Sequence, residues 1–213
     1  MSKPENKAER RQAAKERRLE EMRRRTRRQR LRRLRLMGIG IVVVAAIAGL
    51  VVFNIQRGKQ ATKTLNELAG AAGCTQLQTL GSEGQAHNPP YTYKTDPPTS
   101  GNHQSPAATG VSAQPIPDES QPHNLEHGHV GIQYKDLDDE MLTDLREIVR
   151  DKPTLTFLAP RPEMTPKLAL TAWAKLITCD APNRRAVDLA RQFQKQFSGK
   201  GPEGAVPGSP VGV

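Results

Sequence analysis

The 213-residue sequence predicts an α+β fold: a single small extracytoplasmic domain with a modest β-sheet and about two packing helices, preceded by one transmembrane helix. Three observations lead to this prediction. Residues 37–55 form an uncharged, apolar run of bilayer length. Short runs with alternating apolar residues follow from residue 128, as in half-buried strands. Two later stretches repeat apolar residues at helical spacing.

Residues 1–36 form a strongly basic tail. This segment has 16 Lys and Arg against 5 Glu, whereas residues 37–213 have 16 basic and 17 acidic side chains and are nearly neutral. Because no aromatic residues lie between the arginines, a base-stacking surface is absent and we expect no nucleic-acid partner. The tail is instead expected to lie near anionic lipids, where each basic residue contributes about 1 kcal/mol.

The apolar run of residues 37–55 predicts a transmembrane helix, because 19 helical residues cover about 28 Å. A cleaved signal peptide is the alternative, but the basic segment before the run is long and no small-x-small site follows it. The excess of arginine before the run places the N-terminus in the cytoplasm. We therefore expect a single-pass protein of the plasma membrane with its C-terminal domain outside the cytoplasm.

Beyond the membrane, the sequence predicts a stalk at residues 56–73, a compact domain at 74–197 and a disordered tail rich in Gly and Pro at 198–213. Alternating or β-branched runs predict strands at 91–93, 128–134, 154–158 and 168–177. Helical spacing predicts helices at 137–150, capped by Asp136, and at 183–197, capped by Asn183. Residues 96–122 are expected to be loop.

The chain has two cysteines, Cys74 and Cys179, one near each end of the predicted domain. In an oxidising compartment such a pair is most simply a disulfide. The alternative is that Cys74 is a metal ligand or a free redox thiol, which no Cys-x-x-Cys motif supports.

All five histidines lie between residues 87 and 129, and this confinement indicates a metal site. If residues 123–127 form a helical turn, His123 and His127 share one face. His103, from the preceding loop, can fold over them as a third ligand. Glu126 is placed to be a carboxylate ligand, a hydrogen-bond partner of a ligand, or a general base.

Imidazole and carboxylate ligands without a neighbouring thiolate suit copper or zinc as the cofactor, and not calcium. His87 and His129 are expected to be incidental. Two other functions stay open. One is a structural or protein-interaction module, with an unknown protein partner, in which histidine hydrogen bonds hold the long loop. The other is a metal-dependent hydrolase with Glu126 as its catalytic residue. Its H-x-x-E-H pattern fits poorly, because Pro122 and Gly128 leave no room for a long helix.

Three ordered motifs resemble one family. They are Pro97-Pro-Thr-Ser-Gly101-x-His103, His123-x-Leu-Glu-His127-Gly-x-Val130, and Ala172-Trp173 ahead of Cys179. Together they resemble the largely bacterial domain-of-unknown-function family 3105, over about residues 74–197. The resemblance implies an anchor of one N-terminal helix and no settled activity. It also implies that motif positions of the family are occupied by Cys74, His103, His123, Glu126, His127 and Trp173.

Overall fold

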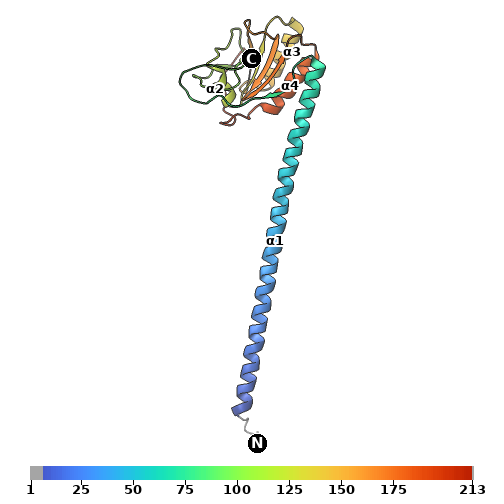
Figure 1. Ribbon diagram of the computed structural model, residues 1–213, viewed down its shortest axis with the longest axis vertical. Coiled ribbons are helices and arrows are strands. Elements are labelled where there is room, and N and C mark those ends of the chain that lie inside the picture. Colours follow the sequence, from blue (N-terminus) through green and yellow to red (C-terminus); the bar gives the residue numbers. More distant parts are fainter. Residues whose placement is uncertain (1–6, 213) are drawn as a thin grey trace. The chain divides into compact units, whose positions relative to one another are not determined.

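The computed structural model describes residues 7–212 and divides into two units, residues 1–57 and 58–213. Residues 1–6 of the predicted basic tail and residue 213 of the predicted disordered tail lie outside the described part of the chain. Helix α1 (Lys7–Ala72) runs through the first unit and supplies the opening of the second. Figure 1 shows this helix and the mixed sheet of the second unit.

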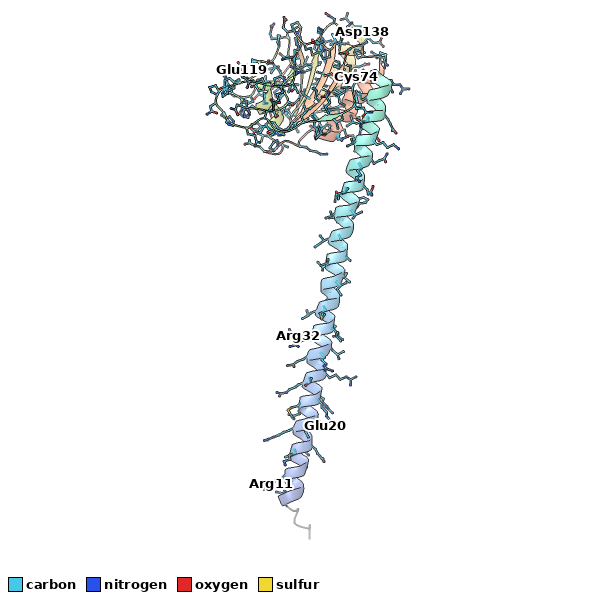
Figure 2. All side chains as sticks on the ribbon, in the orientation of Figure 1. Arg11, Glu20, Arg32, Cys74, Glu119 and Asp138 are labelled. Atoms are coloured by element: carbon cyan, nitrogen blue, oxygen red, sulfur yellow. A yellow bond between two sulfur atoms is a disulfide. The ribbon has the colours of Figure 1, made fainter. Side chains whose placement is uncertain are left out.

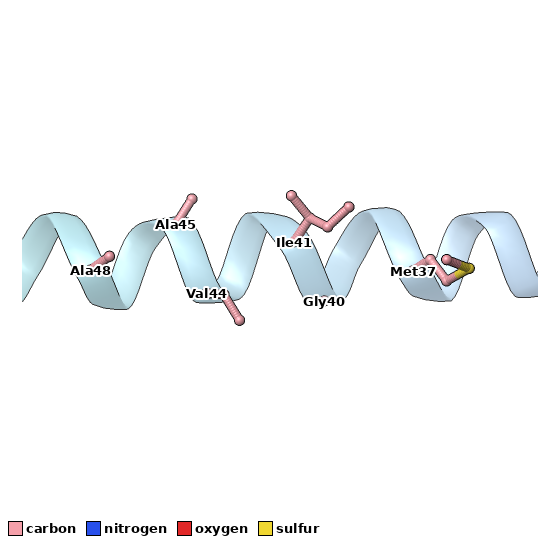
Figure 3. Close-up of a pocket in the computed structure, with 6 residues that line it drawn as sticks. All are labelled: Met37, Gly40, Ile41, Val44, Ala45 and Ala48. Carbon is pink, nitrogen blue, oxygen red and sulfur yellow. The ribbon is translucent and has the colours of Figure 1, made fainter.

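The first unit consists of the N-terminal part of α1, and its described side chains are exposed. Charged side chains such as Arg11, Glu20 and Arg32 project from the helix over its basic stretch (Figure 2). Apolar side chains replace them further along, as Figure 3 shows between Met37 and Ala48. In the described part of the chain, the structure has one helix that is long and apolar enough to cross a membrane. None of the apolar window of this helix is buried. The predicted transmembrane helix is therefore a candidate membrane span.

The second unit is built on a seven-stranded mixed sheet with the order β1-β6-β5-β3-β4-β2-β7. The central strands β3 (Val130–Tyr134), β4 (Thr156–Pro160), β5 (Leu168–Ala172) and β6 (Lys175–Cys179) have five residues each. The shorter strands are β1 (Gln78–Thr79), β2 (Thr109–Val111) and β7 (Pro210–Val211), and β1 and β7 form the two edges. Pairing is antiparallel from β1 to β3 and parallel from β3 to β7. The α+β class with a domain after one candidate transmembrane helix is confirmed.

One face of the sheet carries the main hydrophobic core. Helices α3 (Asp139–Asp151) and α4 (Arg185–Phe197) pack on this face, because each has an apolar stripe at helical spacing. Strand residues such as Ile132, Leu158 and Leu170 meet these stripes. The cap of α3 is Asp138, whose side chain accepts a hydrogen bond from Met141 N; the predicted cap, Asp136, lies instead in a turn with φ of 49°.

The opposite face carries a smaller core made by Ile116, Leu125, Phe157 and Ala159, with Trp173 against it. It is covered by the loops of residues 80–120 and by the short helix α2 (Gln121–Glu126), which lies away from α3 and α4 in Figure 1. Alternation along β4 directs Phe157 and Ala159 to this face and Leu158 to the other. The histidine-rich segments all belong to this second face or its edge.

The predicted stalk differs from the structure. Residues 58–72 continue α1 and belong to the compact unit, with Leu65, Ala69 and Ala72 buried in its main core. The helix end is also bound by side-chain contacts, because the Asn183 amide donates to Ala71 O at 2.9 Å. These apolar residues recur every three or four positions, which is the spacing of a buried helix face. The domain therefore begins near residue 58 and not at residue 74.

Two predicted strands also differ. Residues 91–93 form no strand, and the Tyr93 hydroxyl donates to Asn102 O at 2.7 Å. The single strand expected at 168–177 is a hairpin of β5 and β6, which turns at Trp173 and Ala174. The expected loop at 96–122 includes strand β2.

The C-terminal segment is ordered against the domain, in contrast to the disorder predicted for residues 198–213. Its last strand, β7, pairs in parallel with β2. We call residues 199–212 the C-terminal strap, because they cross the edge of the second face beside α2. The Gly and Pro content that suggested disorder instead permits close backbone approach here.

Candidate metal centre

The loop segments around Ala86 and around Asn102 lie side by side and are joined by hydrogen bonds, and α2 packs next to them. His103 N donates to Ala86 O at 2.9 Å, and Ala86 N donates to the Asn102 side chain at 3.3 Å. Gly101 lies between these contacts with φ of 125°, and a Cβ there would lie 2.9 Å from the Tyr93 ring. Glycine is therefore needed at this crossing. The hydrogen bonds of Ala86 set His87 beside His103.

Helix α2 supplies the next imidazole. It has Pro122 in its first turn, carries His123 and ends at Glu126, and Gly128, with φ of 76°, then turns the chain into β3. The amide of Asn124 fixes the helix to the loop, because it donates to Ala107 O and accepts from Ala107 N, both at 2.9 Å. The short helical turn predicted for residues 123–127 is thus present, with His127 as its C-cap.

Three imidazoles converge where these segments meet. One nitrogen each from His87, His103 and His123 lies within 4.8 Å of the others. The Nε2 atoms of His87 and His103 are 3.3 Å apart. Nitrogens bound to one tetrahedral zinc by bonds of 2.0–2.1 Å lie about 3.3 Å apart. One pair already has that spacing, and the third imidazole has to move by up to about 1.5 Å, the difference between 4.8 and 3.3 Å.

Backbone carbonyls fix the tautomers of two of these rings. Nδ1 of His103 donates to Gly101 O at 2.9 Å, and Nδ1 of His123 donates to Gln104 O at 2.6 Å, since a carbonyl can only accept. In each neutral ring the lone pair therefore lies on Nε2. Metal-binding histidines commonly have their second nitrogen bound in this way.

The pKa of His123 is lowered from its ordinary value. Burial is the main cause, and the neighbouring imidazoles of His127, His103 and His87 lower it further by charge repulsion, while the hydrogen bond to Gln104 raises it. The ring consequently stays neutral to lower pH than an exposed histidine. A neutral imidazole is the form that binds a metal.

Glu126 lies directly beside His103 and is almost completely buried, with 2 % of its side chain exposed. Its Oε1 accepts a hydrogen bond from the Gln85 amide at 2.9 Å. Its Oε2 is 3.1 Å from His103 Nε2 but is not aligned for a hydrogen bond there and has no other donor. A buried carboxylate oxygen facing an imidazole lone pair is unfavourable unless a proton or a cation lies close to both. The arrangement is therefore suited to a cation.

The remaining two histidines have other partners. His127 Nε2 pairs with Glu203 Oε2 at 3.1 Å, although its ring centroid is only 4.6 Å from that of His123. His129 Nδ1 accepts from the Asn124 amide at 3.1 Å, and its Nε2 donates to Val206 O at 2.7 Å. Burial is also the main cause of the lowered pKa of His129.

Of the four predicted metal-site residues, the structure brings the imidazole nitrogens of His103 and His123 together and places the Glu126 carboxylate against His103. The nitrogens of His127 lie outside the group, and His87, which was expected to be incidental, occupies that place. The sequence signal for His87 was its position in the same histidine window. His129 is not among the converging residues.

Cys74 and Cys179 form a disulfide bond between the end of α1 and β6. No free cysteine occurs in the described part of the chain, so the alternative of Cys74 as a thiolate ligand or free redox thiol is wrong. The bond joins residues 105 positions apart and closes the main core at its edge.

Comparison with protein families gives a match over residues 85–208 to a family described as protein of unknown function, DUF3105. The chain belongs to this family. The matched region includes all five histidines and most of the C-terminal strap, which the resemblance had left outside, whereas Cys74 precedes it. No curated protein and no solved structure matches the chain.

Proposed function

We propose that this DUF3105 protein is a membrane-anchored metal-binding protein that holds one copper(II) or zinc ion through His87, His103, His123 and Glu126. The three imidazoles would bind through Nε2 and the carboxylate through Oε2. The unpartnered Oε2 of Glu126, buried 3.1 Å from His103 Nε2, is the observation that carries the proposal. A cation at this point would satisfy both atoms.

The donor set supports the choice of ion. Three nitrogens and one carboxylate oxygen suit zinc, which accepts His and Glu ligands in tetrahedral geometry. The same set suits copper(II), which binds nitrogen and oxygen sites more tightly than other divalent first-row metals. Calcium and magnesium prefer oxygen-only sites, so a cluster dominated by imidazole does not favour them.

Binding is favoured over turnover. Glu126 is buried and tied to Gln85, and His103 is fully buried, so neither side chain is placed to reach a substrate. A general base has to come within hydrogen-bond reach of the proton it removes. The role of holding the loop, expected in the interaction-module alternative, fits Asn124 and His129, whose hydrogen bonds join the loop, α2 and the strap.

We also infer that α1 spans the plasma membrane with residues 1–36 in the cytoplasm, near anionic lipids, and the disulfide-bonded domain outside. The Arg-rich stretch before the apolar segment and the disulfide in the second unit support this orientation. Thr26→Cys and Thr143→Cys place a new exposed thiol in each unit. A membrane-impermeant maleimide added to intact cells should label the second variant and not the first; the reverse labelling would refute the orientation.

The metal site is tested by elemental analysis of the full chain, purified in detergent and dialysed after addition of zinc or copper(II). The wild type should retain about one ion per chain, and His103→Ala should retain less than a tenth of that. His127→Ala is the matched control and should keep its metal, because the His127 side chain pairs with Glu203. Equal metal content in wild type and His103→Ala would remove the proposal.

A further inference from the structure

The C-terminal strap lies directly on the turn that follows α2. Backbone hydrogen bonds run from Glu203 N to Glu126 O at 3.2 Å and from Val206 N to His127 O at 3.1 Å. Gly199 N donates to Gly128 O at 2.7 Å. The strap therefore contacts the backbone of the residue that supplies the carboxylate of the proposed site.

This contact depends on residues without side chains. A Cβ on Gly201 would lie 2.0 Å from Glu126 O and 2.4 Å from Gly128 N, closer than any side chain allows. A Cβ on Gly208 would lie 2.4 Å from Thr109 Cγ2. The strap is thus shaped to fit this surface, and the position of Glu203 within it is defined.

Glu203 is the acidic side chain of the strap, and it reaches His127. Its Oε2 is 3.1 Å from His127 Nε2, with 52 % of the Glu203 side chain and 17 % of the His127 side chain exposed. An ion pair this exposed, in which the imidazole is charged only when protonated, is weak. The His127 ring stacks edge-on against His123, with centroids 4.6 Å apart, so it borders the three converging imidazoles.

We propose that His127 is a fourth imidazole withheld from the metal by Glu203, so that the strap sets the number of histidine ligands at the site. This inference rests on the proposed metal-binding function. With the Glu203 contact in place, the ion is held by three imidazoles, those of His87, His103 and His123, together with the Glu126 carboxylate. When the contact is removed, a rotation of the His127 side chain brings its Nε2 toward the neighbouring His123 and adds a nitrogen to the site.

The test uses the full chain in detergent, with zinc for affinity and copper(II) for ligand counting. Zinc affinity is measured by competition with a chromophoric chelator, and the number of imidazole nitrogens on copper(II) by pulsed electron paramagnetic resonance. Glu203→Ala should bind zinc up to about five-fold more tightly, because an exposed ion pair can hold back no more affinity than it is itself worth. Its copper(II) spectrum should gain one imidazole nitrogen.

Two further variants decide the cause. The double variant Glu203→Ala/His127→Ala should return to wild-type affinity, because the added ligand is gone. Lys200→Ala removes an exposed charge from the same strap and should leave both measurements unchanged. The inference is overturned if Glu203→Ala binds zinc no more tightly than wild type, or if the double variant keeps the gain. If His103→Ala binds as well as wild type, the proposed function itself fails, and that result is separate from the response to Glu203→Ala.

Discussion

Asn124 is the residue whose loss should most weaken the surface that carries the candidate centre. It is fully buried and makes three hydrogen bonds: its Oδ1 accepts from Ala107 N, and its Nδ2 donates to Ala107 O and to His129 Nδ1, at 2.9, 2.9 and 3.1 Å. In Asn124→Ala these three partner groups lose their contacts. A buried polar group left unsatisfied costs about 1–3 kcal/mol. Because Ala107 is only partly buried and water can satisfy some of this loss, we expect a total destabilisation of about 3–4 kcal/mol.

Urea unfolding of the full chain in detergent measures this loss through the fluorescence of Trp173, the only tryptophan. Trp173 packs against the smaller core that α2 covers, so its emission reports on the same face of the sheet. The midpoint should fall while the slope of free energy against urea stays constant. Asn88→Ala, on an exposed loop, is the matched control and should change the stability by less than about 0.5 kcal/mol. A loss below about 1 kcal/mol in Asn124→Ala would refute the reasoning, because it would mean that the three bonds add little.

Three more perturbations have defined outcomes. Reducing the Cys74–Cys179 disulfide opens a loop across 105 residues, so the free energy of unfolding should fall by about 4–5 kcal/mol, measured by urea unfolding with and without reductant. Burial lowers the pKa of His129 in the folded chain. Between the folded and unfolded pKa values, the unfolded chain therefore binds a proton at this residue and the folded chain does not. Stability is then full above about pH 6.5 and falls as the pH drops, and a His129→Gln variant should show a shallower fall in pH-dependent melting. Gly131→Ala would put a Cβ 2.4 Å from Phe157 Cζ, and thermal melting should reveal a destabilisation of about 1–3 kcal/mol.

The regular elements of the main core could be predicted because their apolar side chains recur at a regular spacing. Alternation located β3, and helical spacing located α3 and α4 to within a few residues. The hairpin of β5 and β6 escaped because its turn contains Ala174 at φ of 54°, where sequence patterns expect glycine or asparagine. A continuous apolar run with no turn residue therefore looked like a single strand.

The strap and the end of α1 could not be located for a different reason. The strap is held by backbone hydrogen bonds and close glycine contacts, and neither leaves an apolar pattern in the sequence. The residues after the candidate membrane span carry an apolar stripe, but this stripe is short and continues the same long helix without a break. The composition suggested a stalk in the first place and disorder in the second, whereas the fold buries one face of the end of α1 and holds the strap by backbone hydrogen bonds.

Only some residues of the candidate centre could be predicted from the sequence. The spacing of His123 and Glu126 follows from one helical turn, so their proximity could be expected. The pairing of His87 with His103 depends on two irregular loops joined through Ala86, whose carbonyl accepts from His103 N and whose N–H donates to the Asn102 side chain. No residue period encodes such a crossing. The fourth position was therefore assigned to His127, the residue adjacent in sequence, and not to the one adjacent in space.

The two faces of the sheet differ in what they contribute: one supplies most of the stability, and the other carries the candidate centre. The face under α3 and α4 buries the apolar stripes and borders the disulfide, so it supplies most of the burial that holds the fold. The other face is covered by loops, a six-residue helix and the strap, which are joined mainly by hydrogen bonds between backbone groups and a few polar side chains. Side chains such as His127 and Glu203 can therefore exchange partners there without repacking the main core. The proposed change of ligands at the candidate centre would need only such local rearrangement, because the bonds that position these side chains are individually weak.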